Sequence, residues 1–162
     1  MNIIFNWSKK WFISRYDIYA DSKPVGNLIP KTFSNSAIGQ IHNLDIHFET
    51  RGLFNQKTEI IDLRTNLPLG EITYNTWKTK AVITLSNEVL EWKSLNWLNS
   101  KWGITKGDEN LVSSWNRMLS GEVISYSDNP LYGLIGLFIS EYFNRLSVAI
   151  FVVIFIIIIA GN

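Results

Sequence analysis

The chain contains no cysteine and only two histidines among its 162 residues. The absence of cysteine excludes disulfide bonds and thiol chemistry, and it leaves the redox compartment open. His42 and His47 are five residues apart, so on one strand they would lie on opposite faces of the sheet. Since no acidic pair is suitably spaced beside them, the sequence predicts no metal site.

Charge is also scarce, and it does not gather into one basic stretch. Charged residues make up 18% of the chain and the net charge is +1, with lysines and arginines spread along the sequence. A nucleic-acid-binding domain usually shows a basic stripe along one face. We therefore expect no nucleic-acid partner.

Motifs that carry catalysis or cofactor binding are missing as well. The sequence contains neither G-x-x-x-x-G-K nor G-x-G-x-x-G, which cradle phosphates, and no G-x-S-x-G nucleophile motif. The run "KGDEN" (106–110) lacks the repeated acidic ligands and the closing glutamate of a calcium loop. We predict a protein that is not an enzyme, with no catalytic residues and no cofactor.

A signal peptide is not evident at the amino terminus. The segment "MNIIFNWSKKWF" has only a short apolar stretch, and two lysines and a tryptophan follow it. We expect the amino-terminal domain to stay on the side of the membrane where it is made.

The region from Trp11 to Tyr126 is dominated by alternation of apolar and polar residues at a period of two. Turn signals separate the short apolar runs at 20–26, Arg64–Pro68, Ser86–Glu88 and Gly107–Asp108, and small polar residues make Lys31–Asn43 the clearest loop. About ten to twelve short strands at such spacing are typical of an antiparallel sandwich or barrel. Five tryptophans in the second half of this region are expected to serve core and strand packing rather than to form a stacking platform: Trp77, Trp92, Trp97, Trp102 and Trp115.

The segment after Asp128 and Asn129 begins with Pro130, which is a helix-start signal. The following helix, at about 130–142, is apolar on every side and must be buried in protein or lipid. Its twelve or so residues rise about 18 Å, too little for a hydrocarbon layer of ~30 Å. The sequence therefore predicts a helix enclosed by strands, with the core residues Leu131, Leu134, Ile135, Leu137, Phe138 and Ile139.

This layout resembles the tubby C-terminal-like superfamily, which includes the LURP-one-related proteins and the phospholipid scramblases. Four segments carry the resemblance: "IYADSKPVGNL", "EIIDLRTNLPLGEI", "AVITLSNEVLEWK" and "SYSDNPLYGLIGLFISEY". It covers residues 10 to about 143, and it implies a closed antiparallel β-barrel of about 12 strands around a central hydrophobic C-terminal helix. The chain departs from the family because it continues after that helix.

The remaining tail, Leu146–Ala160, rises about 22 Å as a helix, and thinning of the bilayer can accommodate so short a span. We expect a membrane anchor, with Tyr142, Phe143 and Arg145 at the interface. Packing on the domain surface or at an oligomer interface is the alternative. The lipid-facing residues would be Val148, Ile150, Phe151, Val152, Ile154, Phe155 and Ile157.

One continuous helix over Leu131–Ala160 is a third arrangement, and the sequence argues against it. Such a helix would be about 45 Å long and would overshoot the membrane. It would place Glu141, Asn144 and Arg145 midway, where a charged residue costs ~2.5–3.5 kcal/mol. We therefore expect a break between the two apolar segments.

Together these patterns predict a tubby-like barrel domain over residues 1–145 and a hydrophobic tail over 146–162. The expected function is a non-enzymatic, membrane-associated scaffold or lipid-proximal binding module, with a single-pass C-terminal anchor and a cytoplasmic domain. The alternatives are scramblase-like lipid transport, which only the resemblance suggests, and a soluble interaction protein whose tail docks into a partner.

A few basic residues are candidates for contact with lipid head groups, and ordinary solvated charges are the alternative. Tubby proteins bind phosphoinositides through basic residues, so the resemblance implies a phosphoinositide or another anionic lipid as partner. Near an anionic membrane each lysine contributes ~1 kcal/mol. The candidates are Lys9, Lys10, Arg15, Lys78 and Lys80.

Overall fold

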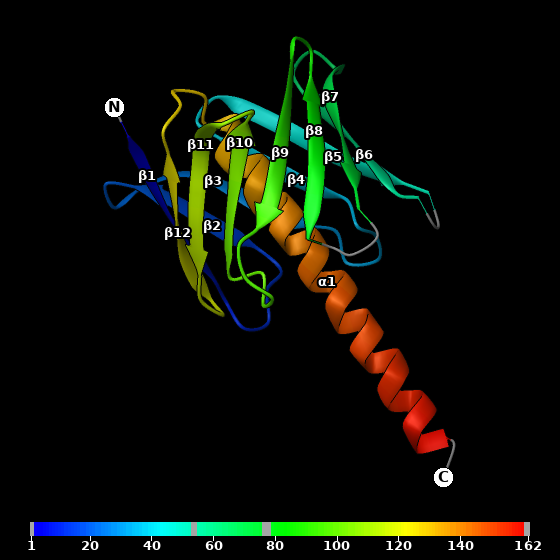
Figure 1. The fold of residues 1–162 in the computed structure, drawn as a ribbon. Helices are drawn as coiled ribbons and strands as arrows, with labels where there is room; N and C mark the ends of the chain where they lie inside the picture. Colours follow the sequence, from blue (N-terminus) through cyan, green and yellow to red (C-terminus); the bar gives the residue numbers. More distant parts are fainter. Residues whose placement is uncertain (1, 53–54, 76–78, 161–162) are drawn as a thin grey trace.

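The computed structural model describes residues 2–52, 55–75 and 79–160. Within them, twelve antiparallel strands close into a barrel in which each strand pairs with its neighbours in sequence and β1 pairs with β12 (Figure 1). The predicted fold class is confirmed. The strands are β1 (Ile3–Lys9), β2 (Tyr16–Ala20), β3 (Lys23–Pro30), β4 (Ala37–Ile41), β5 (Leu44–Arg51), β6 (Lys57–Asp62), β7 (Leu67–Tyr74), β8 (Lys80–Leu85), β9 (Glu88–Ser94), β10 (Lys101–Lys106), β11 (Glu109–Asn116) and β12 (Ser120–Ser125).

The tight turns lie close to where the sequence predicts them. Asp21 and Ser22 join β2 to β3, and both have positive φ, as the favoured two-residue hairpin turns require. The turn predicted at Arg64–Pro68 lies at 63–66, where the Asp62 carboxylate accepts a hydrogen bond of 2.8 Å from the Arg64 backbone N–H. Short polar turns thus set the register of the hairpins.

Two segments differ from the expectation. The amino-terminal segment forms β1, a full strand that closes the barrel by pairing with both β2 and β12. Lys31–Asn43, expected to be a loop, contains β4. The small residues that read as a loop line the inner face of this strand, where the helix approaches it. A Cβ atom at Gly39 would lie 3.0 Å from a methyl carbon of Leu134.

The carboxyl-terminal segment forms one continuous helix, α1 (Leu131–Ala160), so the expected break is wrong. Its first half threads the barrel and its second half projects away from it (Figure 1). Glu141, Asn144 and Arg145 therefore lie at the rim of the barrel rather than midway through a membrane. One long helix is compatible with these charges because only its second half projects from the barrel, so the helix does not lie wholly in lipid.

The core is the space between the strands and the first half of α1. Every residue from Leu131 to Phe143 is buried, including the six predicted core residues. Phe138 stacks on Phe48 of β5, with ring centroids 4.3 Å apart and the planes 7° from parallel. Trp92 and Trp102 are fully buried, as expected of core residues.

The expectation of a core position is wrong for Trp97. This side chain is 89% exposed, in the loop between β9 and β10, and Trp115 on β11 is 46% exposed. Trp77 lies outside the described residues. The guanidinium carbon of Arg117 lies 4.6 Å from the ring centroid of Trp115, so the exposed indole that needs an explanation other than packing is that of Trp97.

Candidate functional site

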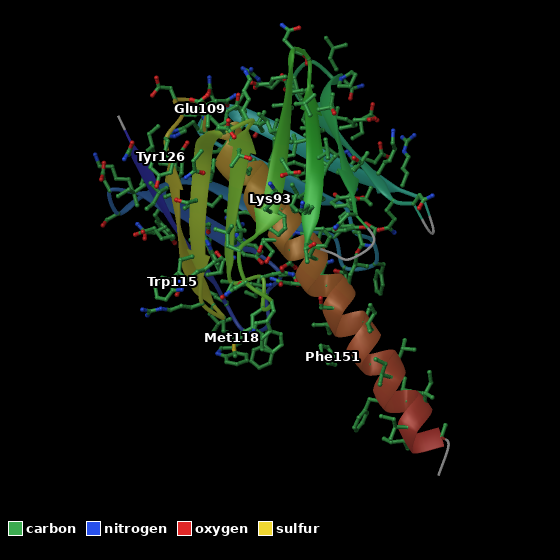
Figure 2. The ribbon with its side chains drawn as sticks, viewed as in Figure 1. Lys93, Glu109, Trp115, Met118, Tyr126 and Phe151 are labelled. Atoms are coloured by element: carbon green, nitrogen blue, oxygen red, sulfur yellow. The ribbon has the colours of Figure 1, made fainter. Side chains whose placement is uncertain are left out.

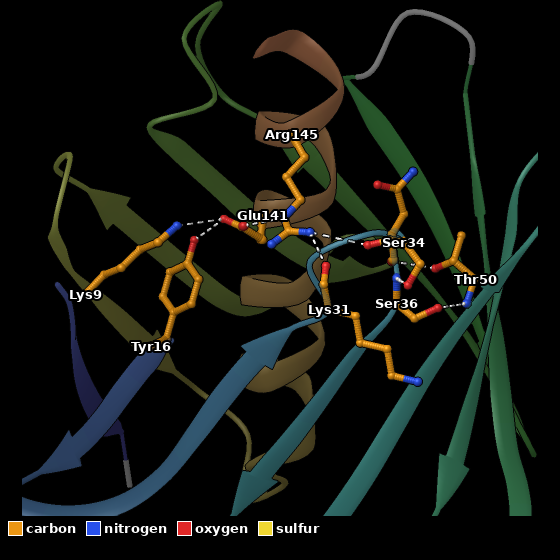
Figure 3. Close-up of polar contacts among 9 residues, drawn as sticks. Lys9, Tyr16, Lys31, Ser34, Ser36, Thr50, Glu141 and Arg145 are labelled. Carbon is orange, nitrogen blue, oxygen red and sulfur yellow. Dashed lines mark hydrogen bonds and ion pairs between the residues drawn. The ribbon is translucent and has the colours of Figure 1, made fainter. Parts of the chain in front are cut away.

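The most elaborate polar cluster lies where α1 leaves the barrel. Glu141 is buried, and its carboxylate accepts hydrogen bonds from the Tyr16 hydroxyl at 2.5 Å and from the Arg145 Nε at 2.7 Å. The Lys9 ammonium lies 3.4 Å from the same carboxylate. Figure 3 shows Glu141 between these three partners, two of which come from β1 and β2. A buried carboxylate is stable only with such partners.

Arg145 also ties the helix to the loop between β3 and β4 (31–36). Its Nη1 donates hydrogen bonds to the backbone carbonyl of Lys31 at 2.6 Å and to that of Ser34 at 3.3 Å (Figure 3). The far side of this loop is fixed to β5, because the Ser36 hydroxyl accepts a bond from the Thr50 N–H at 2.9 Å. One guanidinium therefore positions the loop against the helix.

A hollow of about 800 Å³ opens beside this cluster. Its charged groups, Lys9, Glu141 and Arg145, already bind one another. Gln56 on its wall accepts hydrogen bonds from the side chain of Asn35 and from the hydroxyl of Tyr142. The hollow therefore offers neutral polar groups and, with two cations against one carboxylate, one net positive charge, which suits hydrogen bonding to a polar or anionic group. Its remaining lining comes from Ser14, Thr32, Phe33, Ser34, Thr50, Gly52, Asn144 and Val148.

The cluster perturbs one titratable group strongly. Burial raises the pKa of the Tyr16 hydroxyl well above its usual value, and the negative charge of Glu141 raises it further. Tyr16 is therefore a hydrogen-bond donor at all ordinary pH values, as its contact with the carboxylate requires.

The basic residues expected at lipid head groups fall at the same end of the barrel. Lys9 ends β1, Lys10 and Arg15 lie in the loop that follows it, and Lys80 begins β8. Arg15 pairs with Asp17 at 2.7 Å, whereas Lys10 and Lys80 are exposed and form no ion pair with any described residue. Lys78 lies outside the described residues. The structure brings the other four to one end, but only Lys9 joins the cluster.

The tail residues predicted to face lipid lie on the projecting half of α1. From Val148 onward every large apolar side chain of this half is exposed in the protein itself. Among the described residues, α1 is the one helix long and apolar enough to cross a membrane. The residues in question are Val148, Ile150, Phe151, Val152, Ile154, Phe155 and Ile157.

The histidines lie apart, in the turn after β4 and on β5. His47 contacts the Lys31 ammonium at 3.2 Å, and partial burial together with that cation lowers its pKa. In the part of the chain that the structure describes, no three His, Asp or Glu side chains are grouped to hold a metal ion.

The sequence places Glu141 near the end of the predicted core helix, at about 130–142, but gives no sign of its partner Tyr16. The two residues are separated by 125 positions, and nothing in the local pattern links them. Only the closed topology, which brings the first two strands beside the end of the core helix, places them together.

Comparison with protein-family models, with curated proteins and with solved structures finds no match.

Proposed function

We propose that this protein is a membrane-anchored β-barrel domain that acts without catalysis, as a lipid-proximal binding module or scaffold. The observation that carries the proposal is the change of environment along α1. The helix is buried to Phe143, and from Val148 to Ala160 its surface is apolar and uncovered. A soluble monomer rarely exposes an apolar surface so continuous.

Lipid is the covering that suits this surface best. Side chains such as Phe151 and Ile154 are exposed on all sides of the helix, so one protein partner with one binding groove would leave part of them in water. The segment Leu146–Ala160 rises about 22 Å, which a locally thinned bilayer can accommodate. Arg145 at the domain side favours a cytoplasmic domain under the positive-inside tendency.

The tubby-like assignment is part of this proposal. The order of elements supports it, since the barrel precedes a central apolar helix, as the resemblance implies. Scramblase-like transport is the weaker candidate, because the projecting half of α1 carries no polar stripe along which a head group could pass.

Membrane extraction tests the anchor. The full chain should stay with membranes after alkaline carbonate washing and should dissolve in detergent. A chain that stops after Arg145 keeps every buried residue of α1, so it should be soluble and give a strand-dominated circular dichroism spectrum. A full chain that is soluble without detergent would overturn the anchor and favour a partner-docking tail.

A further inference from the structure

Helix α1 passes from the barrel to its uncovered half without a spacer. Phe143 is fully buried and Leu146 still packs against the core, whereas Val148 is 63% exposed. The helix is continuous here, and the three residues from Phe143 to Leu146 rise about 4.5 Å. The headgroup layer on each side of a bilayer is ~5–8 Å thick. If Leu146 enters hydrocarbon, the end of the barrel must therefore lie within that layer.

The loops at this end carry large apolar side chains in the open. We call the four fully described loops around the helix the exit loops: 10–15, 31–36, 95–100 and 117–119. Each has at least one such side chain exposed, and Phe12 and Phe33 are almost completely so, at 99% and 101%. Figure 2 shows Met118 at this end, on the side where the helix with Phe151 emerges. The full set is Trp11, Phe12, Ile13, Phe33, Leu95, Trp97, Leu98 and Met118.

The opposite end of the barrel has a different composition. Its two-residue turns are Asp21–Ser22, His42–Asn43, Ser86–Asn87 and Gly107–Asp108, all small or polar. In the longer connections there, among the described residues, Leu63 and Tyr126 are the exposed large apolar side chains. Among the described loop residues, exposed large apolar side chains thus concentrate at the exit end, with eight there against these two.

Charged residues are also distributed unevenly, with most basic residues at the exit end and more acidic residues at the opposite end. In the described chain, basic residues gather at the exit end, in the exit loops, within two residues of the strand ends on that side and at the helix exit: Lys9, Lys10, Arg15, Lys31, Arg51, Lys57, Lys80, Lys93, Lys101, Arg117 and Arg145. The same positions hold fewer acidic residues: Asp17, Glu49, Glu59, Glu122 and Glu141. The matching positions at the opposite end hold three basic residues, Lys23, Arg64 and Lys106, against a larger acidic set: Asp21, Asp45, Asp62, Glu88, Asp108, Glu109 and Asp128.

Some of the exit-end cations are neutralised by nearby carboxylates, as Lys57 is by Glu71 at 3.0 Å. Lys10, Lys80 and Lys101 are exposed and form no ion pair with a described residue. Aromatic side chains and unpaired cations around an apolar helix are the combination that the interface of an anionic leaflet favours.

We propose that the exit end is a membrane-docking surface, which seats the barrel end-on against an anionic leaflet with the exit-loop aromatics in the headgroup layer. The inference rests on the proposed function, because α1 fixes the distance to the bilayer. The Arg145 contacts give the surface a defined shape, since they hold the loop that carries Phe33 against the helix.

Site-directed labelling of the full chain tests the docking, and the absence of cysteine makes each introduced label unique. Nitroxide labels are placed at the exit end (Phe12→Cys, Phe33→Cys, Leu98→Cys), at the opposite end (Asn87→Cys, Asp108→Cys) and on the helix (Ile154→Cys). The chain is reconstituted in phosphatidylcholine vesicles with and without phosphatidylserine. All positions are exposed, so the labels should leave the fold intact.

For each label we compare the rate of collision with oxygen to the rate of collision with a water-soluble nickel complex. In vesicles with phosphatidylserine, this ratio should be several-fold higher for the exit-end labels than for the opposite-end labels. If only the Ile154 label collides preferentially with oxygen, the proposal of a membrane-docking surface is wrong and the proposed membrane anchor is retained. If the Ile154 label also stays in water, the proposed function is wrong as well.

Charge-reversal variants test whether attraction to anionic lipid, and not only closeness to the bilayer, seats the exit end on the membrane. Lys10→Glu combined with Lys80→Glu should raise the water accessibility of the exit-end labels in vesicles with phosphatidylserine. The matched control at the opposite end, Lys23→Glu with Arg64→Glu, should leave it unchanged. An equal effect of both pairs, or no dependence on phosphatidylserine, would overturn the assignment of an anionic leaflet.

Discussion

Trp102 of β10 packs against Gly136 of α1 so closely that a Cβ atom at position 136 would lie 2.3 Å from Cζ3 of the indole. Trp102 is fully buried and its ring also stacks on Trp92, so it has no room to withdraw. The missing side chain at Gly136 is what lets the helix and this strand share the interior. Gly133, one turn earlier, has only ordinary contacts, with the nearest atom at 3.4 Å.

This difference predicts opposite results for two alanine substitutions in the same helix. Gly136→Ala should lower the free energy of unfolding by about 1–3 kcal/mol, because the added methyl group overpacks the core. Gly133→Ala should be neutral or stabilising by up to ~1 kcal/mol, since alanine favours helix. Chemical denaturation followed by circular dichroism measures both, and equal effects would contradict the threaded helix.

Two aspartate substitutions distinguish the halves of α1. Leu134→Asp should unfold the barrel, because Leu134 is 1% exposed and a lone buried carboxylate costs several kcal/mol. Ile154→Asp should leave the thermal midpoint of the barrel unchanged and weaken retention in carbonate-washed membranes, by ~2.5–3.5 kcal/mol if the residue reaches the bilayer centre. A melting temperature of Leu134→Asp close to that of the parent would refute its burial.

The rim cluster should stabilise the fold measurably. Glu141→Leu removes the carboxylate and leaves Tyr16 and Arg145 without their partner. Because hydrogen bonds to charged groups are each worth ~1.5–3 kcal/mol, we expect a loss of at least that size. Glu71→Gln is the matched control, since its pair with Lys57 is half-exposed and should contribute less than ~1 kcal/mol. Similar losses for both variants would argue against a special role of Glu141.

Alkaline pH should destabilise the protein through its buried tyrosines. Burial raises the pKa of Tyr16 and of Tyr74 in the folded state above the ordinary value of 10.0. Below pH 10 both states keep these protons, so the stabilisation is fully present there. Above it the unfolded chain releases protons that the folded chain retains, and stability falls as the pH rises.

Unfolding free energies measured across this range check the prediction. The fall above pH 10 should be less steep in Tyr16→Phe, which has one buried phenol fewer. A parallel fall in both proteins would mean that Tyr16 ionises as freely in the folded state as in the unfolded chain.

The strands and turns were predictable because they depend on local signals. Alternation at a period of two and left-handed turn residues such as Asp21 and Asn66 act over a few positions. The failures have a common cause in long-range packing. Gly39 reads as a loop residue, yet it makes room for Leu134 nearly a hundred residues later. Likewise, the charge of Glu141 seemed to require a break in the helix until Lys9 and Tyr16 were brought beside it.

In the candidate site, too, the features of a single segment could be predicted, whereas contacts between residues distant in sequence could not. The apolar tail and the individual cations can be read from the sequence, because each is a property of one segment. Their gathering at one end depends on which end of each strand a residue occupies. A single error in strand count within the chain, such as the omission of β4, would exchange the ends of all later strands and hide the asymmetry.

The pairing of β1 with β12 has a consequence for assembly. The seven residues of β1 add Phe5 and Trp7 to the interior, but their larger effect is to leave the sheet without a free edge. A chain that lost them would present two unpaired borders, on β2 and β12, beside an oily helix. Strand β1 thus closes the barrel, and while it is unpaired the free edges of one copy of the chain can associate with those of another.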